Sequence, residues 1–198
     1  LSFRTLKGAK FINIYRYFTD KEVWPRGYPL TYILSDEKAE SVHMESQVKL
    51  WQFLADEDPD VDAIYRLTNN TPIYFKDSGP IVLDRGTVCP INSQNTIFYK
   101  QLFPLLYLPA FVTFRFTDIL RGLIAQPLLW DHGYRLGFGG VTVIQRRNPH
   151  DYLKDFESEV PVYLYSEKVV DATREALTNT AINDLGEQLK LCYKALFD

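Results

Sequence analysis

The sequence predicts a single α/β unit in which a mixed sheet is followed by a helical C-terminal tail. Short apolar runs separated by turn residues dominate before about residue 100, and such runs are typical of strands. After about residue 115, apolar residues recur at helical spacing with little Gly or Pro to interrupt them. The 198 residues show neither an internal repeat nor a flexible linker, which favours one compact unit.

The composition is that of a folded protein with an ordinary surface. Lys and Arg number 22 against 25 Asp and Glu, so 22 − 25 gives a net charge of −3. Beyond Arg146-Arg147 there is no cluster of Lys and Arg, so the chain lacks the basic footprint of a nucleic-acid-binding protein. Charged residues interrupt every apolar stretch before it reaches the roughly 18 residues of a transmembrane helix. We therefore expect no nucleic-acid partner and no membrane segment in this chain.

The first third of the chain is predicted to contain strands and one rigid loop. Ala9–Tyr15 alternates apolar and polar residues, which predicts a half-buried strand. Trp24–Pro29 contains two prolines and a glycine, so it forms a fixed, non-helical loop. Gln47–Leu54 is compatible with a strand or with a short helix, because so few residues do not separate the two periods.

An acidic stretch follows, with five carboxylates in residues 55–62. Pro59 suits the first turn of a helix that contains Ala63–Leu67. Asp60-Val61-Asp62 forms a D-x-D pattern, which can hold a divalent cation that bridges a diphosphate. The alternative is a solvated acidic helix start that favours the helix dipole.

The remaining elements follow from periodicity and turn residues. Thr117–Trp130 is the clearest helix, with Thr117 or Asp118 as its cap and a kink at Pro127. Leu136–Ile144 alternates like a glycine-hinged hairpin or a strand pair. Short strands are predicted at Ile81–Leu83 and Thr87–Cys89, and helices at Asp151–Glu157, Val169–Leu177 and Ala181–Leu196.

Polar residues in the loops are candidates for a site, although the chain lacks the common catalytic signatures. No phosphate-binding glycine loop, nucleophile elbow or paired Cys motif occurs in the sequence. Arg26 lies in the rigid loop beside two aromatic residues, which suits phosphate or sugar recognition. The alternative is a surface arginine stacked on Trp24. The polar side chains of Asn92–Asn95 need hydrogen-bond partners.

Two further candidates lie near predicted helix starts. Asp118 and Arg121 are three residues apart, hence on one face of the predicted helix. Asp118 can act there as a general base toward a hydroxyl, or it can be a helix cap with an intrahelical ion pair. His150 can be a metal ligand or a phosphate contact, although a lone histidine is more often neither. Cys89 is expected to be structural.

Five blocks of sequence, in the same order, resemble the STELLO-like glycosyltransferase family and cover roughly residues 10 to 170. The blocks are Trp24–Leu30, Asp58–Thr68, Gly86–Thr96, Phe114–Gly122 and Arg147–Leu153. A more distant resemblance is to the reversibly glycosylated polypeptides, which are UDP-arabinopyranose mutases. It rests on Phe11-Ile12-Asn13 followed by Arg26–Pro29, and it puts Arg26 in the place of their glycosylated arginine.

The resemblance implies a GT-A-type glycosyltransferase fold, of which residues 1–160 form the acceptor-side part and residues 161–198 a helical tail packed on it. It also implies a UDP-sugar donor, a divalent cation (Mn or Mg) and a carbohydrate or other hydroxyl acceptor. In both families the nucleotide-binding half and its metal motif precede the segment that corresponds to Trp24–Pro29. Asp60-Val61-Asp62 falls in a later block, so the resemblance does not make it the metal motif.

The resemblance further implies roles for the candidate residues. Asp118 would accept the acceptor's proton and Arg26 would contact the sugar or the diphosphate. Arg121 would orient Asp118, and His150 would bind the metal. The sugar would be held by Trp24, Asn92, Gln94 and Asn95. On this basis we expect Asp118→Asn to abolish transfer with little loss of folding stability.

Two other functions remain as alternatives. One is a glycosyltransferase-like scaffold or partner-binding domain without catalysis, because the nucleotide-binding half of the family is not recognisable in this chain. The other is a UDP-sugar mutase-like protein, which rests on Arg26 alone.

Overall fold

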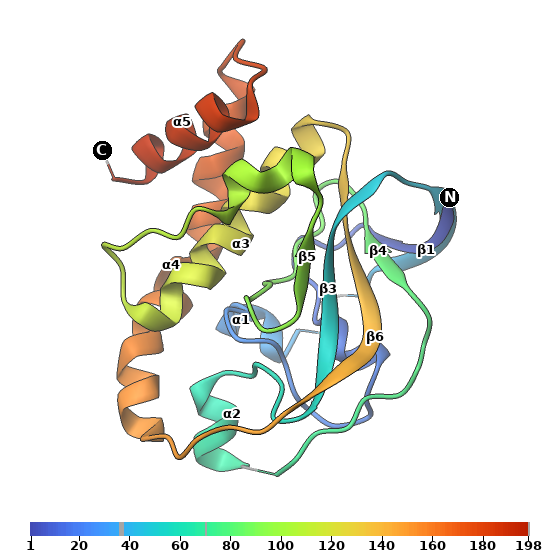
Figure 1. Cartoon of the computed structure of the whole chain (residues 1–198), viewed down its shortest axis with the longest axis vertical. Helices are drawn as coiled ribbons and strands as arrows, with labels where there is room; N and C mark the ends of the chain where they lie inside the picture. The colour runs from blue at the N-terminus through green and yellow to red at the C-terminus, as the bar shows by residue number, and fades with distance from the viewer. Residues whose placement is uncertain (36–37, 70, 198) are drawn as a thin grey trace.

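The computed structural model describes residues 1–35, 38–69 and 71–197 and contains a mixed six-stranded sheet (Figure 1). The strands lie in the order β2-β1-β4-β6-β3-β5. Their bounds are Ser2–Lys7 (β1), Glu40–Glu45 (β2), Val48–Glu57 (β3), Ile81–Leu83 (β4), Thr96–Phe98 (β5) and Arg135–Gln145 (β6). The pairs β1–β4 and β3–β6 are parallel, and the other pairs are antiparallel. The predicted α/β fold with a mixed sheet is confirmed, and it is consistent with a GT-A-like fold.

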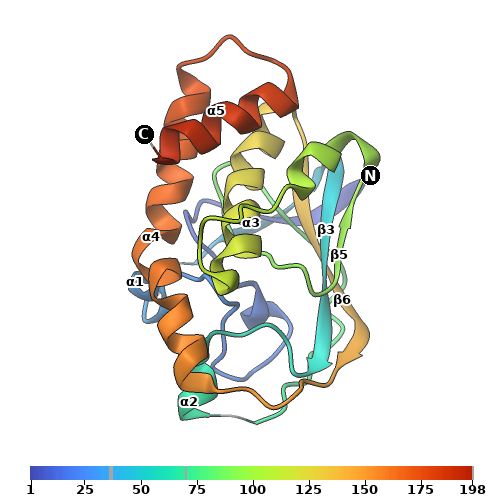
Figure 2. The same cartoon turned by 60° about the vertical axis from the view of Figure 1, so that its left-hand side comes forward.

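The helices gather mainly in the second half of the chain, and the predicted helical C-terminal region is confirmed. Figure 2 shows α3, α4 and α5 together on one side of β3, β5 and β6. The α-helices are α1 (Leu30–Ile33), α2 (Ala63–Thr68), α3 (Phe114–Asp131), α4 (Tyr152–Thr178) and α5 (Leu185–Phe197), and the 3-10 helices are η1 (Ile14–Tyr17) and η2 (Lys100–Leu106). Among the described residues, no helix is both long and apolar enough to cross a membrane.

Residues 48–57 form strand β3, and over residues 48–54 buried and half-buried side chains alternate, as the two-residue repeat of a strand requires. Leu50 and Leu54 are buried in the core, on the side that the helices cover. Trp51 and Phe53 point the other way and are half-buried. The strand alternative for Gln47–Leu54 is therefore correct, and the short helix is not.

The predicted strand at Ala9–Tyr15 is wrong. Phe11 makes an isolated bridge with Val88, and residues 14–17 form the 3-10 helix η1. The side chain of Asn13 accepts a hydrogen bond from the Tyr15 amide at 3.1 Å, which caps η1 and competes with strand pairing. The predicted strand at Thr87–Cys89 is likewise reduced to one bridge residue, Val88.

Helix α3 begins earlier than its periodicity predicts. Thr113 occupies the N-cap position, so Thr117 and Asp118 lie inside the first turns and neither caps the helix. The helix continues through Pro127 to Asp131, and Gly133 follows with a φ of 74°, the left-handed conformation that glycine adopts without strain.

Two segments that were predicted as broken elements are continuous. Residues 135–145 form the single strand β6, in which Gly137 and Gly139 permit close approach of the Trp51 and Phe53 rings and make no turn. Residues 152–178 form one helix, α4, capped by Asp151 and running through Pro161. The domain boundary expected after residue 160 falls inside this helix.

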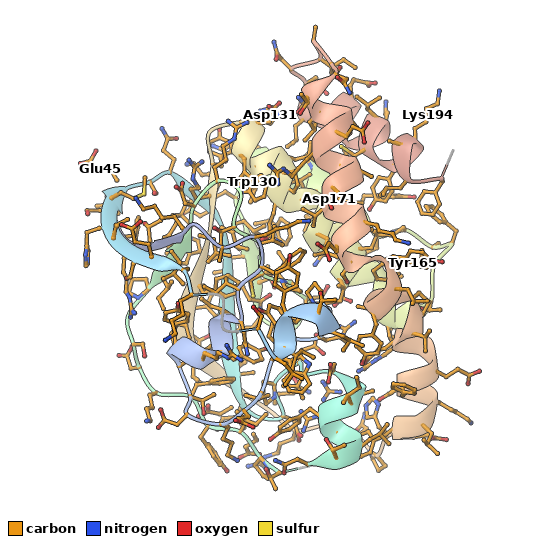
Figure 3. The ribbon with its side chains drawn as sticks, turned by 180° about the vertical axis from the view of Figure 1, so that it is seen from behind. Glu45, Trp130, Asp131, Tyr165, Asp171 and Lys194 are labelled. Atoms are coloured by element: carbon orange, nitrogen blue, oxygen red, sulfur yellow. The ribbon has the colours of Figure 1, made fainter. Side chains whose placement is uncertain are left out.

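Helix α4 also ties the start of the chain to the helical layer. Figure 3 shows Tyr165 and Asp171 along α4. The Lys10 ammonium lies 2.9 Å from carboxylate oxygens of Glu167 and Asp171. This contact holds the segment after β1 against the helix.

Candidate functional site

Two residues that were predicted as catalytic lie in direct contact. The Arg26 Nη2 donates to both carboxylate oxygens of Asp118 at 3.1 Å, although the residues are 92 positions apart. The Arg26 Nε and Nη2 also hold Asp60, at distances of 2.8 to 3.1 Å. The loop at residues 24–29, the segment before α2 and the first turns of α3 therefore meet at one guanidinium.

The Arg26 guanidinium is enclosed, with only 6% of the residue exposed. Burial disfavours its charge, but Asp60 and Asp118 more than offset this effect and raise the pKa of Arg26 above its usual value. Burial likewise acts to raise the pKa of Asp60, and Arg26 reverses the direction, so that the pKa is lowered. Both groups are therefore charged at neutral pH, and the alternative of a surface arginine at Arg26 is wrong.

A second buried pair adjoins the first through the backbone. The Arg26 Nη1 donates to the carbonyl of Arg115, and the Arg115 side chain pairs with Glu159 from α4. Glu159 is fully buried and also accepts hydrogen bonds from the Ala63 amide at 2.8 Å and the Tyr163 hydroxyl at 2.9 Å. We call Arg26, Asp60, Arg115, Asp118 and Glu159 the Arg26 cluster.

The D-x-D carboxylates are neither solvated nor directed toward one another as a metal pair. Asp60 is held by Arg26, with Arg147 at 3.4 Å. Asp62 is the N-cap of α2, accepting from the Tyr65 amide at 2.9 Å, and its other oxygen accepts from the Trp24 indole. Burial raises the pKa of Asp62 to about 6, with Glu159 and Asp60 adding to the shift. The solvated helix start is therefore wrong, and Pro59 lies outside α2.

The oxygens of Asp118 are largely occupied by protein donors. Besides Arg26, its Oδ2 accepts from the Ser93 amide at 3.0 Å and its Oδ1 from the Ile119 amide at 3.1 Å. The side chain is 15% exposed. Asp118 thus joins the Asn92–Asn95 loop to Arg26, and the predicted orienting contact comes from Arg26, not from Arg121.

The three amide residues of the loop use their side chains inside the protein. The Asn92 Oδ1 accepts from the Gln94 amide at 2.8 Å, and the Gln94 Nε2 donates to the Asp58 carbonyl at 3.1 Å. The Asn95 Nδ2 donates to the Leu54 carbonyl at 3.0 Å and to the Thr142 hydroxyl at 2.8 Å. These bonds fix the loop beside Asp118, and the contact of these residues with a sugar stays a prediction.

Arg121 is a cation that the described part of the protein leaves incompletely paired. It is 6% exposed, its Nη2 donates to the Ser93 hydroxyl at 3.0 Å, and it stacks on Phe98 at 5.1 Å. Its buried Nε has no hydrogen-bond partner in the described part of the chain. Burial lowers the pKa of Arg121, which Asp118 only partly opposes. A buried guanidinium with an unused donor is suited to an anionic ligand.

The described residues do not assemble a metal site of their own. No group of three His, Cys, Asp or Glu side chains converges among residues 1–35, 38–69 and 71–197. The His150 Nδ1 lies 3.1 Å from an Asp155 oxygen on the surface. Asp155 in turn lies 3.9 Å from Arg115, so His150 is connected to the edge of the Arg26 cluster. Its role as a ligand stays a prediction.

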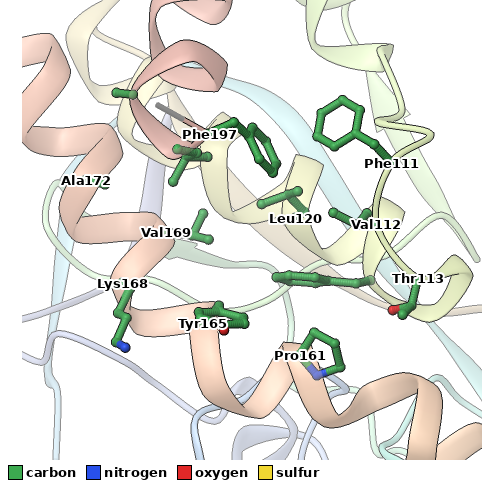
Figure 4. A pocket seen from close by; sticks show the side chains of 13 residues that line it. Phe111, Val112, Thr113, Leu120, Pro161, Tyr165, Lys168, Val169, Ala172 and Phe197 are labelled. Atoms are coloured by element: carbon green, nitrogen blue, oxygen red, sulfur yellow. The ribbon is translucent and has the colours of Figure 1, made fainter.

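Two hollows flank this region and differ in character. One, of about 780 Å³, is polar and has Trp24 on its wall together with Arg16, Asp20 and Lys21. The other, of about 650 Å³, is apolar and lies between α3, α4 and α5. Figure 4 shows the rings of Phe111 and Phe197 in it, close to Leu120. The polar hollow is the one that reaches a predicted site residue.

Sequence reasoning missed three residues that hold the site together. These are Arg115, Glu159 and Ser93, to which the sequence assigns no individual role. Arg115 and Ser93 lie inside the sequence blocks that carry the family resemblance, which is the signal that points to them. Glu159 lies outside those blocks, inside a helix that carries many exposed charges, so nothing in the sequence distinguishes it.

Comparison with known proteins gives concordant matches. The family model of the STELLO glycosyltransferases matches residues 115–197. The probable glycosyltransferase STELLO2 of Arabidopsis thaliana is 30% identical over 149 residues, which are 71% of this chain and 19% of that protein. The probable glycosyltransferase STELLO1 of the same plant is 32% identical over 130 residues, which are 62% of this chain and 17% of that protein. The match thus spans less than a fifth of the length of either relative.

Proposed function

Because this chain is STELLO-like and forms a glycosyltransferase-like domain, we propose that it is the acceptor-side part of an enzyme that transfers a sugar from a UDP-sugar to a hydroxyl acceptor. The relatives are named as probable glycosyltransferases, and their printed names specify neither donor nor acceptor. The donor, the acceptor and the transfer step are therefore part of the proposal.

The observation that carries the proposal is Arg121, a buried cation with an unpaired donor beside Asp118 and the Asn92–Asn95 loop. An unpaired buried charge is costly unless a ligand completes its pairing. A diphosphate or a sugar hydroxyl would pair with the exposed edge of this guanidinium, since Arg pairs readily with phosphate oxygens. Arg121 therefore takes the substrate contact that was expected of Arg26.

Arg26 is a positioning residue in this proposal. Each nitrogen of its guanidinium donates to a protein oxygen, from Asp60, Asp118 or Arg115. Its contribution is to orient the Asp118 carboxylate and to fix the first turns of α3 against the loop at residues 24–29. The same enclosure disfavours the mutase alternative, which requires Arg26 to be an accessible acceptor.

The cation implied by the resemblance, Mn or Mg, has no three-residue ligand set among the described side chains. Magnesium in proteins is held by one or two carboxylates together with substrate phosphates. The carboxylates of the Arg26 cluster are already paired with arginines. No step of the proposal passes through a cation.

A second candidate function is a glycosyltransferase-like binding domain without catalysis. It is favoured by one observation, namely that both oxygens of Asp118 accept hydrogen bonds from Arg26 and from backbone amides. A general base needs a lone pair directed at the acceptor hydroxyl. The two functions agree on ligand binding at Arg121 and differ in whether Asp118 carries out a proton transfer.

Binding is tested by calorimetric titration of the chain with UDP, in the presence of MnCl₂ and of MgCl₂. We expect micromolar binding that Arg121→Met weakens by about 10- to 150-fold, since a charge-assisted hydrogen bond contributes about 1.5–3 kcal/mol. Arg146→Met is the matched control, because Arg146 is exposed and pairs with Glu57. Absence of UDP binding to the unaltered chain would overturn the transferase proposal.

Catalysis is tested with Asp118→Asn and radiolabelled UDP-sugars. The expectation that this variant folds normally no longer holds, because it removes the charge that faces the buried Arg26. Each assay is therefore paired with a UDP titration of the same sample. Lost transfer with retained UDP binding supports the base, whereas unchanged turnover excludes it. Covalent label on Arg26 would support a mutase instead.

A further inference from the structure

The face of the sheet opposite the helices carries a band of apolar side chains from three strands and the residue after β5. Figure 2 shows α3, α4 and α5 on the other side of β3 and β5. Ile97 and Tyr99 are 51% and 44% exposed, and the others are half-buried. We call this band the aromatic face, and its members are Phe3, Trp51, Phe53, Ile97 and Tyr99.

The rings of the aromatic face are fixed by the backbone beneath them. Trp51 and Phe53 stack with centroids 6.1 Å apart and planes 27° apart. A Cβ atom at Gly137 would lie 2.6 Å from two carbons of the Trp51 ring, and one at Gly139 would lie 2.4 Å from a Phe53 ring carbon. Each ring therefore lies directly on a glycine of β6. Phe3 supports Trp51 from the side, with centroids 5.7 Å apart.

A hollow of about 410 Å³ opens on this face, and two polar side chains lie in its lining. Tyr99 and Asp77 line it beside Trp51 and Phe53. The Asp77 Oδ1 accepts from the Gly79 amide at 3.0 Å, and in the described part of the chain its Oδ2 has no protein partner. The Lys49 ammonium lies 4.8 Å from the centre of the Tyr99 ring. Flat apolar rings thus alternate with hydrogen-bonding groups at the rim.

We propose that the aromatic face binds an oligosaccharide, with the C–H faces of pyranose rings stacked on Trp51 and Phe53 and the sugar hydroxyls bonded to Asp77 and Tyr99. The electron-rich face of an aromatic ring attracts polarised C–H groups, and an equatorial arrangement of hydroxyls leaves both faces of a pyranose apolar. This site is separate from Arg121 and Asp118, which lie on the helix-covered side. It does not depend on the proposed sugar transfer.

The dimensions and the rigidity of the site favour a carbohydrate over a protein partner. The hollow falls within the range of roughly 300–1,000 Å³ that is usual for small-ligand sites. Rings that are pinned on glycines lose little side-chain freedom when a ligand covers them, so stacking needs no reorganisation. Asp77 at the hollow and Lys49 beside Tyr99 add charged hydrogen-bonding groups, with which sugar hydroxyls can pair.

The test uses cellohexaose, in which every ring hydroxyl is equatorial, and the whole chain without nucleotide. Binding is followed by titration with two-dimensional amide NMR and by Trp fluorescence. We expect Trp51→Ala and Phe53→Ala each to weaken binding by about three- to tenfold, the value of one aromatic contact. Asp77→Asn keeps the bond to the Gly79 amide and should also weaken binding. Tyr74→Ala is the matched control, since Tyr74 is 59% exposed and does not line the hollow.

Thermal unfolding of each variant separates lost binding from lost folding. Asp77→Asn tests binding without disturbing the core, because Asp77 is exposed. Cellohexaose that does not bind at millimolar concentration overturns the proposal. Binding that Trp51→Ala and Asp77→Asn leave unchanged overturns it as well. A third contrary result is concentration-dependent dimerisation that Trp51→Ala abolishes while the sugar has no effect, because the face is then an interface between copies. UDP binding is measured on the same samples, so either proposal can fail without the other.

Discussion

The Arg26 cluster and the aromatic face show opposite relations between side-chain chemistry and burial. In the cluster, charged residues from separate segments are enclosed and pair with one another. On the aromatic face, apolar rings from neighbouring strands lie where solvent reaches them. A residue type alone therefore does not identify a ligand site. A side chain is a better candidate for ligand binding when the fold leaves some of its hydrogen-bond donors without a partner. Arg26 is fully paired within the protein, whereas Arg121 is not.

The largest loss of folding stability is expected when the Arg26 cluster loses its central cation. Arg26→Met leaves Asp60 and Asp118 without their buried partner, so we expect the free energy of unfolding to fall by about 3–5 kcal/mol. This is a large share of the roughly 5–15 kcal/mol of a typical domain. Urea unfolding followed by circular dichroism measures it, with the exposed Arg85→Met as control. A loss no greater than that of the control would show that the cluster does not hold the fold.

The next effect concerns Asp62, at the edge of the cluster. Its folded pKa of about 6 lies above the 3.8 of the free side chain, so the folded state binds the extra proton between these values. Stability from this group is therefore full below about pH 4 and is lost as the pH rises through about 6, by about 2–3 kcal/mol. Asp62→Asn should remove this decline, and parallel wild-type and variant curves of unfolding free energy against pH would contradict it.

A smaller loss of folding stability is expected on the aromatic face, where the glycine backbone of β6 lies directly against the rings. Gly139→Ala places a methyl group against Phe53, and we expect a loss of about 1–3 kcal/mol from overpacking. Gly140→Ala is the matched control, because its new Cβ meets only an Asp77 oxygen, at 3.6 Å. Thermal unfolding compares the two. Equal melting temperatures would mean that Phe53 moves freely, which would remove the rigidity on which oligosaccharide binding depends.

The smallest effect is expected outside both regions, at a charged contact near the surface. Lys10→Met removes the pairing with Glu167 and Asp171, whose side chains are 39% and 53% exposed. We expect a loss of only about 0.2–1 kcal/mol that decreases in high salt, because solvent screens such pairs. Unfolding in low and high salt measures it. A loss as large as that of Arg26→Met would show that burial does not explain the difference between the two contacts.

The sequence predicts local structure well where periodicity is long or a loop is rigid. The proline-rich loop at residues 24–29 and the body of α3 illustrate this, because each depends on neighbours within a few residues. The strand predicted at Ala9–Tyr15 fails because the Asn13 side chain caps a 3-10 turn, which alternation of apolar residues does not reveal. The continuous α4 was predicted as separate helices, although Pro161 is accommodated within it.

The sequence predicts which residues lie at the candidate site, but not what each of them does there. Arg26 and Asp118 were selected from loop chemistry and family resemblance, and they do meet. Their contact joins segments 92 positions apart, so no local pattern shows that they neutralise each other. The aromatic face was not predicted, because Trp51 and Phe53 have the residue types of a core. Only the packing of α3 on one side of the sheet decides which face stays open.

The order of the strands also has a consequence for biosynthesis. β3 ends at Glu57, but its long partner β6 begins only at Arg135. Ribosomes add roughly 5–20 residues per second, so β3 waits roughly 4–16 s for the strand that pairs with most of its length. During that time only the short β5 can cover one of its edges, and Trp51 and Phe53 lack the glycines on which they lie. The nascent chain therefore passes through a period in which an apolar strand edge is a target for chaperones or for aggregation.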